Sequence, residues 1–257
     1  MKRALLPLVL SVALMSLTGV VAANAEVKTK FVDYRQGDVD LRGYLAYDDS
    51  FSGKRPGVLL VHDREGLTAK TFKDAEMIAK LGYVVLAADM YGKGVAPKTV
   101  PEMAALTGIY DADHPLMVSR SEAGFDVLRE NPLVDSTKLA LIGYCFGGTV
   151  ALELAKAGVP IAGVVSVHGA FRNLSTAPAS NIRGRVLILH GAEDKTAPLD
   201  SLFGFIGDLR TANVDWQLEL YSGATHTFTT PSNPAEERAD REYKGATEKF
   251  FKEIFGL

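Results

Sequence analysis

The sequence predicts an α/β fold with a doubly wound, mostly parallel sheet that carries helices on both faces. Short apolar runs alternate with longer segments of helical character along most of the chain, and this spacing favours repeated strand–helix–strand units. The runs are apolar at consecutive rather than alternate positions, which is typical of strands buried on both sides. A functional site in such a fold is expected beyond the carboxyl ends of the strands.

The elements follow one another in a regular order. Two amphiphilic strands are expected at residues 28–34 and 39–47, and buried strands at 57–61, 84–88, 139–142, 161–167, 186–189 and 216–221. Helices are expected at 71–81, 115–130, 149–157, 198–211 and 233–255. The segment 91–113 is rich in glycine, proline and small residues without a strong strand pattern, so it either frames a binding pocket or is an ordinary surface excursion.

The amino terminus has the pattern of a secretory signal peptide. Lys2 and Arg3 precede an apolar run over residues 4–21, and small residues at 23–25 suggest cleavage before Glu26. We therefore expect a signal peptide at 1–25, a single domain at 26–257, and export to the periplasm or the medium. A retained membrane anchor is the alternative. The 31 acidic residues outnumber the 28 basic ones, and nothing in this balance suggests a nucleic-acid partner.

Residues 143–148, Gly-Tyr-Cys-Phe-Gly-Gly, are the most informative motif. They join an apolar strand to an apolar helix and place Cys145, the only cysteine, at the turn. In a Gly-x-nucleophile-x-Gly turn, a strained backbone pushes the nucleophile out of the sheet, and the glycines let strand and helix pass closely. The helix terminus would also stabilise a thiolate and a nearby oxyanion. The alternative is a small apolar cysteine that only fills space.

An acid and then a histidine follow the candidate nucleophile, which is the order that this type of fold requires. Asp194 lies at the carboxyl end of the strand expected at 186–189, and Glu193 competes with it for the role of orienting acid. His226 lies in the loop after the strand at 216–221 and is the candidate base. Of the other four histidines, His62, His168 and His190 also lie at strand ends, and His114 does not.

With these residues in view, the chain resembles the dienelactone hydrolase family of α/β hydrolases over about residues 44–257. The resemblance rests on the motif at 143–148, on Val-Ser-Val-His-Gly at 165–169, on His-Gly-Ala-Glu-Asp at 190–194 and on the histidine loop at 221–231. It implies the α/β-hydrolase fold, with Cys145 as nucleophile, Asp194 as orienting acid and His226 as base.

The resemblance also implies roles for residues outside the triad. Asp63 occupies the position of a family glutamate that takes part in activating the thiol, and the backbone N–H groups of Arg64 and Phe146 would form an oxyanion hole. Dienelactone-cleaving members carry two arginines for the substrate carboxylate, whereas this chain has Lys93 and Thr230 in those neighbourhoods. Tyr91 and Lys93 are therefore only weak candidates for substrate contacts, and Lys93 can equally be a solvated surface lysine.

The expected function is hydrolysis of an ester or lactone through a thioester acyl-enzyme. The alternatives are a general carboxylesterase or thioesterase without dienelactone specificity, and a non-catalytic binding protein on the same fold. The expected partner is a small-molecule ester or lactone, without stable membrane association after signal cleavage, and a monomer is favoured. The histidines are scattered in the sequence and the single cysteine offers no paired thiolates, so we expect no metal and no cofactor.

Overall fold

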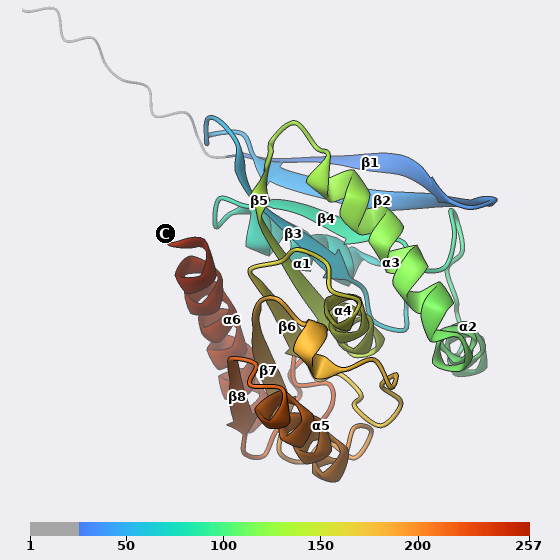
Figure 1. Ribbon diagram of the computed structural model, residues 1–257, viewed down its shortest axis with the longest axis vertical. Helices are drawn as coiled ribbons and strands as arrows, with labels where there is room; N and C mark the ends of the chain where they lie inside the picture. Colours follow the sequence, from blue (N-terminus) through green and yellow to red (C-terminus); the bar gives the residue numbers. More distant parts are fainter. Residues whose placement is uncertain (1–25) are drawn as a thin grey trace, which may run out of the picture.

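The computed structural model describes residues 26–257, and the signal peptide expected at 1–25 lies outside them. One eight-stranded sheet runs through the described part in the order β1-β2-β4-β3-β5-β6-β7-β8 (Figure 1). The strands are β1 (Val27–Gln36), β2 (Val39–Asp48), β3 (Arg55–Val61), β4 (Val84–Ala88), β5 (Val134–Tyr144), β6 (Gly163–Val167), β7 (Arg185–Gly191) and β8 (Trp216–Tyr221). The last six strands of this order, β4-β3-β5-β6-β7-β8, are parallel to one another. Strand β2 pairs antiparallel with both β1 and β4.

Helices cover both faces of the sheet, as the alternation of elements predicts. The helices are α1 (Ala69–Ala79), α2 (Val100–Ala112), α3 (His114–Arg129), α4 (Phe146–Lys156), α5 (Leu199–Thr211) and α6 (Pro234–Phe255), and a short 3-10 helix lies at Ala179–Asn181. One apolar core packs against α3, α4 and α5, and the other packs against α1 and α6. Strands β3, β4 and β6 are buried along their whole length between these layers, which explains their continuous apolar runs.

The segment 91–113 differs from the prediction, because its second half forms helix α2. Thr99 and Glu102 form a capping box at its start, in which the Thr99 side chain accepts from the Glu102 N–H and the Glu102 carboxylate accepts from the Thr99 N–H. Only Tyr110 of this helix is buried, so no amphipathic stripe marked it in the sequence. The Tyr110 ring lies 5.5 Å from that of Phe146, so α2 reaches the residue that follows the candidate nucleophile.

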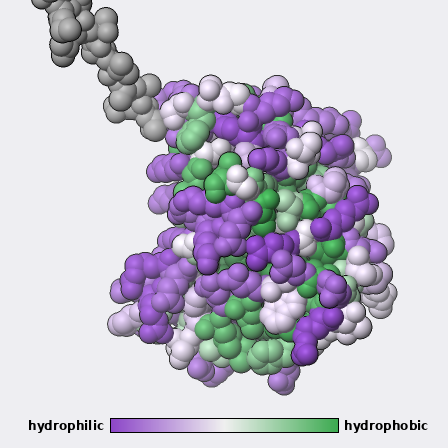
Figure 2. Space-filling model, turned by 60° about the vertical axis from the view of Figure 1, so that its left-hand side comes forward, coloured by the Kyte–Doolittle hydropathy of each residue, from purple (hydrophilic) through white to green (hydrophobic). Residues whose placement is uncertain are grey.

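The surface of the described part is mixed in character. The face shown in Figure 2 is mostly hydrophilic, and apolar side chains gather in its lower part. Among residues 26–257, no helix has both the length and the apolar character needed to cross a membrane.

Candidate active site

The turn between β5 and α4 has the strained geometry of a nucleophile elbow. Cys145 has φ 53° and ψ −117°, a backbone conformation that side-chain-bearing residues rarely adopt. Strand β5 ends at Tyr144. Helix α4 begins at Phe146, which is three residues before the helix start that the sequence predicts. A Cβ atom at Gly143 would overlap the backbone of Gly147, so that position has room only for glycine.

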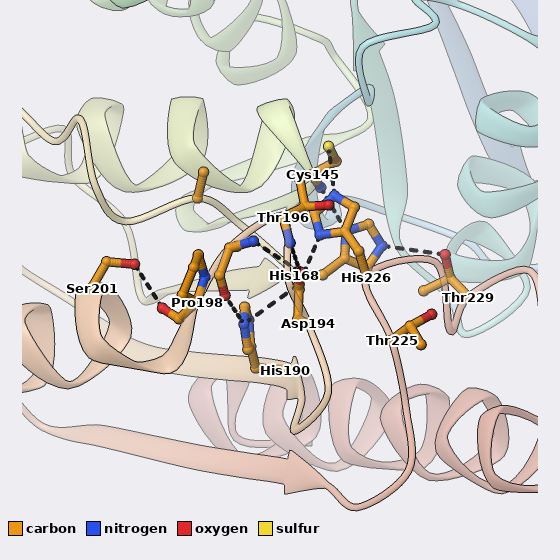
Figure 3. A network of polar contacts seen from close by, with 12 residues as sticks. Cys145, His168, His190, Asp194, Thr196, Pro198, Ser201, Thr225, His226 and Thr229 are labelled. Atoms are coloured by element: carbon orange, nitrogen blue, oxygen red, sulfur yellow. Dashed lines mark hydrogen bonds and ion pairs between the residues drawn. The ribbon is translucent and has the colours of Figure 1, made fainter.

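Cys145, His226 and Asp194 form one chain of hydrogen bonds, although they come from the ends of three different strands (Figure 3). The His226 Nε2 atom lies 3.0 Å from the Cys145 Sγ atom. The His226 Nδ1 atom lies 2.7 Å from the Asp194 Oδ2 atom. With Nδ1–H donating to the carboxylate, Nε2 faces the sulfur and can exchange a proton with it.

Asp194 is fixed by backbone donors, and this separates it from Glu193. The Asp194 Oδ1 atom accepts hydrogen bonds from the N–H groups of Thr196 and Ala197, each at 2.8 Å. Its Oδ2 atom therefore remains directed at His226. The Glu193 side chain is exposed, whereas that of Asp194 is buried. The structure thus brings Asp194, and not Glu193, to the histidine.

The electrostatics of the three residues favour a charged His226. Burial opposes its charge, but the hydrogen bonds with Asp194 and Cys145 outweigh that effect and raise the pKa of His226 to about 9. Burial likewise opposes the charge of Asp194, yet the hydrogen bonds from His226 and from the Ala197 N–H hold the pKa of Asp194 below its ordinary value. The arrangement can therefore hold an imidazolium between a carboxylate and a thiolate.

His168 lies directly beside this chain of hydrogen bonds and was not singled out from the sequence. Its Nδ1 atom accepts from the Cys145 N–H at 3.1 Å, and its Nε2 atom lies 3.3 Å from the Thr229 Oγ1 atom. The rings of His168 and His226 have centroids 4.8 Å apart. Burial, followed by the nearby His226 and Lys70, holds the pKa of His168 well below its ordinary value.

Two of the histidines that are scattered in the sequence lie close to Cys145 in the structure. Ligand atoms of Cys145, His168 and His226 all lie within 4.8 Å of one another, and such a set of donors suits zinc. Each of these residues already has protein partners, however. His168 uses both ring nitrogens, toward Cys145 and Thr229, and His226 uses Nδ1 toward Asp194. A metal ion here would have to displace the hydrogen bond between Cys145 and His168.

The loop after β3 carries the other residues implied by the family resemblance. The Asp63 Oδ1 atom accepts from the Glu65 N–H at 2.8 Å, and no hydrogen bond joins Asp63 to Cys145 within residues 26–257. Phe146 is the first residue of α4, where an N–H has no acceptor in its own helix. The Arg64 carbonyl accepts from the buried Tyr91 hydroxyl at 3.1 Å, which ties this loop to the segment after β4.

The two weak candidates for substrate contacts have different surroundings. Tyr91 is buried, and its ring stacks against Phe146 at 5.9 Å. Lys93 is exposed, and its ammonium lies 2.9 Å from the Asp33 Oδ2 atom on strand β1. Arg42 binds the other oxygen of the same carboxylate at 2.6 Å. Lys93 is therefore held in an ion-pair cluster at the β1–β2 hairpin, whereas Tyr91 forms part of the wall beside the elbow.

A second histidine that sequence reasoning passed over, His62, supports this wall. Its Nε2 atom accepts from the Met90 N–H at 3.2 Å, so Nδ1–H donates to the Asp63 carbonyl at 2.6 Å. Its ring packs 4.8 Å from that of Tyr91. His62 thereby joins the loops that follow β3 and β4. The only signal in the sequence that pointed to His62 was its position at a strand end, and His168 has the same kind of position.

A cavity of about 820 Å³ lies elsewhere, between α5 and the segment 171–180. Its lining includes Phe171, Leu174 and Phe205, and none of Cys145, Asp194 and His226 borders it. Size alone therefore does not make this cavity the active site. The candidate active site is instead the region where the elbow, the hydrogen-bonded histidine and the buried acid meet.

Comparison with known proteins agrees with the geometry. The model of the dienelactone hydrolase family matches residues 41–255. The chain is 24% identical over 206 residues to a carboxymethylenebutenolidase homolog of Mus musculus, covering 79% of this chain and 82% of that one. It is also 24% identical over 209 residues to protein usf of Aquifex pyrophilus, covering 77% and 86% of the two chains.

A solved structure extends the likeness to the whole fold. A dienelactone hydrolase-like promiscuous phosphotriesterase from metagenomic libraries is 32% identical to this chain. The two superpose with a TM-score of 0.83 over 90% of this chain and 100% of the other. With the elbow, the parallel sheet and the family match in agreement, the chain belongs to the dienelactone hydrolase family and is an α/β hydrolase.

Proposed function

We propose that the chain hydrolyses a carboxylic ester or lactone, with Cys145 as nucleophile, His226 as acid and base, and Asp194 as the orienting acid. The observation that carries this proposal is the continuous hydrogen-bonded path from the Cys145 sulfur through both nitrogens of His226 to the buried carboxylate. A nucleophile, a base and an orienter in this arrangement perform acyl transfer on several unrelated folds.

The reaction proceeds in two halves. The Cys145 thiolate attacks the carbonyl carbon, and the carbonyl π electrons move to the oxygen, which accepts hydrogen bonds from the N–H groups of Arg64 and Phe146. When the tetrahedral adduct collapses, the C–O bond to the leaving group breaks, and His226 gives its Nε2 proton to the departing oxygen. The product is an alcohol or enol and a thioester on Cys145. In a lactone both parts stay in one molecule.

Water completes the cycle. His226, now neutral at Nε2, takes a proton from a water molecule as its oxygen attacks the thioester carbonyl. The second adduct collapses with loss of the thiolate, which regenerates the ion pair with His226. Because a thiolate is itself a good leaving group, an adduct formed from an amide tends to return to reactants. Esters, enol esters and lactones are therefore the proposed substrates.

The second candidate function is a general carboxylesterase or thioesterase that does not require a carboxylate on its substrate. The ion pair of Lys93 with Asp33 supports it, because Lys93 is the one cation that the family resemblance suggested for holding a substrate carboxylate. Thr230 supplies no charge in the other neighbourhood. A panel of aryl esters with and without a free carboxylate distinguishes the two candidates. An aryl phosphotriester belongs in the panel because of the activity for which the metagenomic relative is named.

The test of the proposal is ester hydrolysis by residues 26–257 before and after one equivalent of a thiol-alkylating reagent. We expect activity to fall in proportion to labelling at Cys145, and mass spectrometry to detect an acyl adduct on Cys145 during turnover of a slow ester. Cys145→Ala should be inactive, unlabelled and as stable as the parent. Full activity in the labelled protein or in Cys145→Ala would contradict the proposed nucleophile. No hydrolysis of any ester in the panel would favour the binding-protein alternative.

We also propose that the protein is exported and that its signal peptide is removed before Glu26. The basic start, the apolar run and the small residues at 23–25 support this. Expression of the full chain in a bacterial host, followed by fractionation and amino-terminal sequencing, tests the proposal. A full-length protein in the membrane fraction would contradict cleavage and favour a retained anchor.

A further inference from the structure

We propose that His168 is a positioning residue that joins the backbone of the nucleophile to the loop of the catalytic histidine through one neutral, tautomer-locked imidazole. This inference rests on the proposed function, because it assigns His168 a part in the reactivity of the same thiol. His168 does not touch the reacting atoms. It acts through Cys145 on one side and through the loop that carries His226 on the other.

The Cys145 amide is one of the two groups that His168 holds. Its N–H is shared between the Val167 carbonyl at 3.0 Å and the His168 Nδ1 atom at 3.1 Å. A backbone N–H can only donate, so Nδ1 must present its lone pair and cannot carry the ring proton. This contact adds a side-chain acceptor to the residue with the strained φ of 53°. It therefore helps to hold the conformation that directs the sulfur at His226.

The opposite ring nitrogen of His168, Nε2, bonds the loop that carries His226. Because Nδ1 carries no proton, the single proton of the neutral ring is on Nε2, which donates to the Thr229 Oγ1 atom at 3.3 Å. Thr229 lies three residues after His226 in the same loop. The two hydrogen bonds of one ring thus span the distance between the nucleophile and the base, as Figure 3 shows.

The surroundings of His168 maintain this arrangement. His168 itself has φ 40°, and its ring packs edge-on against the buried Phe228 at 5.4 Å. The charged and titratable groups that face it are His226, Lys70, His190, Tyr144 and Cys145. With a proton on Nδ1, the His168 N–H and the Cys145 N–H would face each other as two donors with no acceptor between them. The protonated ring would also place a second cation beside the His226 imidazolium. His168 therefore stays neutral while His226 changes its charge during the reaction.

The decisive experiment compares two nearly isosteric replacements. His168→Asn keeps an acceptor close to the position of Nδ1 and tolerates the positive φ, whereas His168→Leu removes the acceptor. The measured quantity is the second-order rate constant for iodoacetamide alkylation of Cys145, which needs no substrate. We expect His168→Leu to lower it by about five- to tenfold. We expect His168→Asn, which keeps the acceptor for the Cys145 N–H but loses the bond to Thr229, to lower it by about twofold to fivefold. Thr229→Val, which removes only the hydroxyl, should lower it by about twofold to fivefold.

The matched control is His114→Asn, because His114 bonds only the Asn173 carbonyl and lies in the first turn of α3. It should leave the alkylation rate and turnover unchanged. With an ester that is hydrolysed, His168→Leu should lower kcat by a similar factor and leave KM within about twofold, because an alignment of reacting groups is lost rather than a substrate contact. Wild-type alkylation rates in both His168→Leu and Thr229→Val would overturn the inference, as would equal losses in the Leu and Asn variants.

A measurement on the unaltered protein covers the case in which His168→Leu does not fold. Nitrogen-15 NMR of labelled histidine should show His168 with an unprotonated Nδ1 and a protonated Nε2, unchanged between about pH 5.5 and 8.5. The opposite tautomer, or a titration in that range, would overturn the inference. If no ester is hydrolysed but the alkylation and NMR results hold, the proposed function fails and the role of His168 in thiol reactivity stands.

Discussion

The loops after β5, β7 and β8 differ sharply from the loops after β3 and β4, although all five lie at the carboxyl edge of the same sheet. In the first group, Cys145, Asp194 and His226 bind one another. In the second group, Asp63 binds the backbone of its own turn and Lys93 binds a strand at the far edge of the sheet. Motif resemblance suggested roles in both groups. Only in the first do the side chains depend on one another for their hydrogen bonds.

The difference shows which roles assigned from the sequence can be checked against a partner residue in the folded protein. A residue whose role requires a specific partner can be checked against that partner, as Asp194 is against His226. A charged residue whose proposed partner is the substrate has no such partner within the protein. Lys93 is the example here, and it pairs with the nearby carboxylate of Asp33. If function follows the same division, replacements in the first group of loops should have larger effects than replacements in the second.

Replacement of His226, the proposed base, should have the largest effect. We expect His226→Gln to lower kcat/KM for an activated ester by about a thousandfold or more, because both halves of the reaction need its proton. Stopped-flow hydrolysis with active-site titration measures it, and circular dichroism checks the fold. A loss of less than tenfold would contradict the role of His226 and remove the contrast between the two groups of loops.

Replacement of Asp194, the proposed orienting acid, has a matched control next to it in the sequence. Asp194→Asn should lower kcat by about a hundredfold to ten-thousandfold, since an amide no longer holds the same tautomer of His226. Glu193→Gln changes the adjacent, exposed residue in the same way and should leave kcat within twofold of the parent. Steady-state kinetics of both variants with one ester provide the measurement. Similar losses in the two variants would show that Asp194 is not the specific partner.

The raised pKa of His226 makes stability depend on pH. The folded protein holds the charged form more tightly than the unfolded chain does, because the pKa rises from 6.5 to about 9. The contribution is therefore complete below about pH 6.5 and disappears as the pH rises through about 9. We expect the difference in unfolding free energy between the parent and His226→Gln to be larger at pH 6 than at pH 9.5. Urea unfolding at both values measures it, and a difference that grows with pH would contradict the assignment.

Asp63→Asn should have a moderate effect. The carboxylate is half-buried near the elbow but bonds its own turn, so we expect turnover to fall by about threefold to tenfold with little change in stability. Glu65→Gln, an exposed carboxylate two residues later, is the control. Turnover and thermal melts of both variants are compared. Unchanged turnover in Asp63→Asn would show that Asp63 has no part in activating the thiol. A hundredfold loss would show an effect as large as that expected for Asp194→Asn.

Lys93→Ala should have the smallest effect. Its ion pair with Asp33 is exposed, so we expect stability to change by less than about 1 kcal/mol. We also expect kcat/KM to change by less than twofold for aryl esters with or without a free carboxylate. A selective loss with the carboxylate-bearing ester would show that Lys93 leaves Asp33 to bind substrate, and would support a dienelactone-like specificity.

Much of the fold was open to prediction because its signals are local. The strands 84–88 and 216–221 were predicted with the bounds that the structure shows. Strand β4 is covered on both faces and is a continuous apolar run, whereas β8 is at the edge of the sheet and, contrary to the prediction of a buried strand, is only half-buried over most of its length. Helix α2 was missed because it buries only Tyr110 and therefore has no apolar stripe. Its capping box at Thr99 and Glu102 was present in the sequence and could have indicated it.

The sequence by itself determined most of the strands, every long helix except α2, and the elbow at Cys145, because glycine spacing and apolar runs act over a few neighbouring residues. It named both Glu193 and Asp194 and ranked them only by resemblance. Tertiary structure decided between them, since burial and two backbone donors direct one carboxylate at His226. It also placed His168 between Cys145 and Thr229, partners 23 and 61 residues away. Such contacts leave no local pattern, because they exist only once distant strand ends meet at one edge of the sheet.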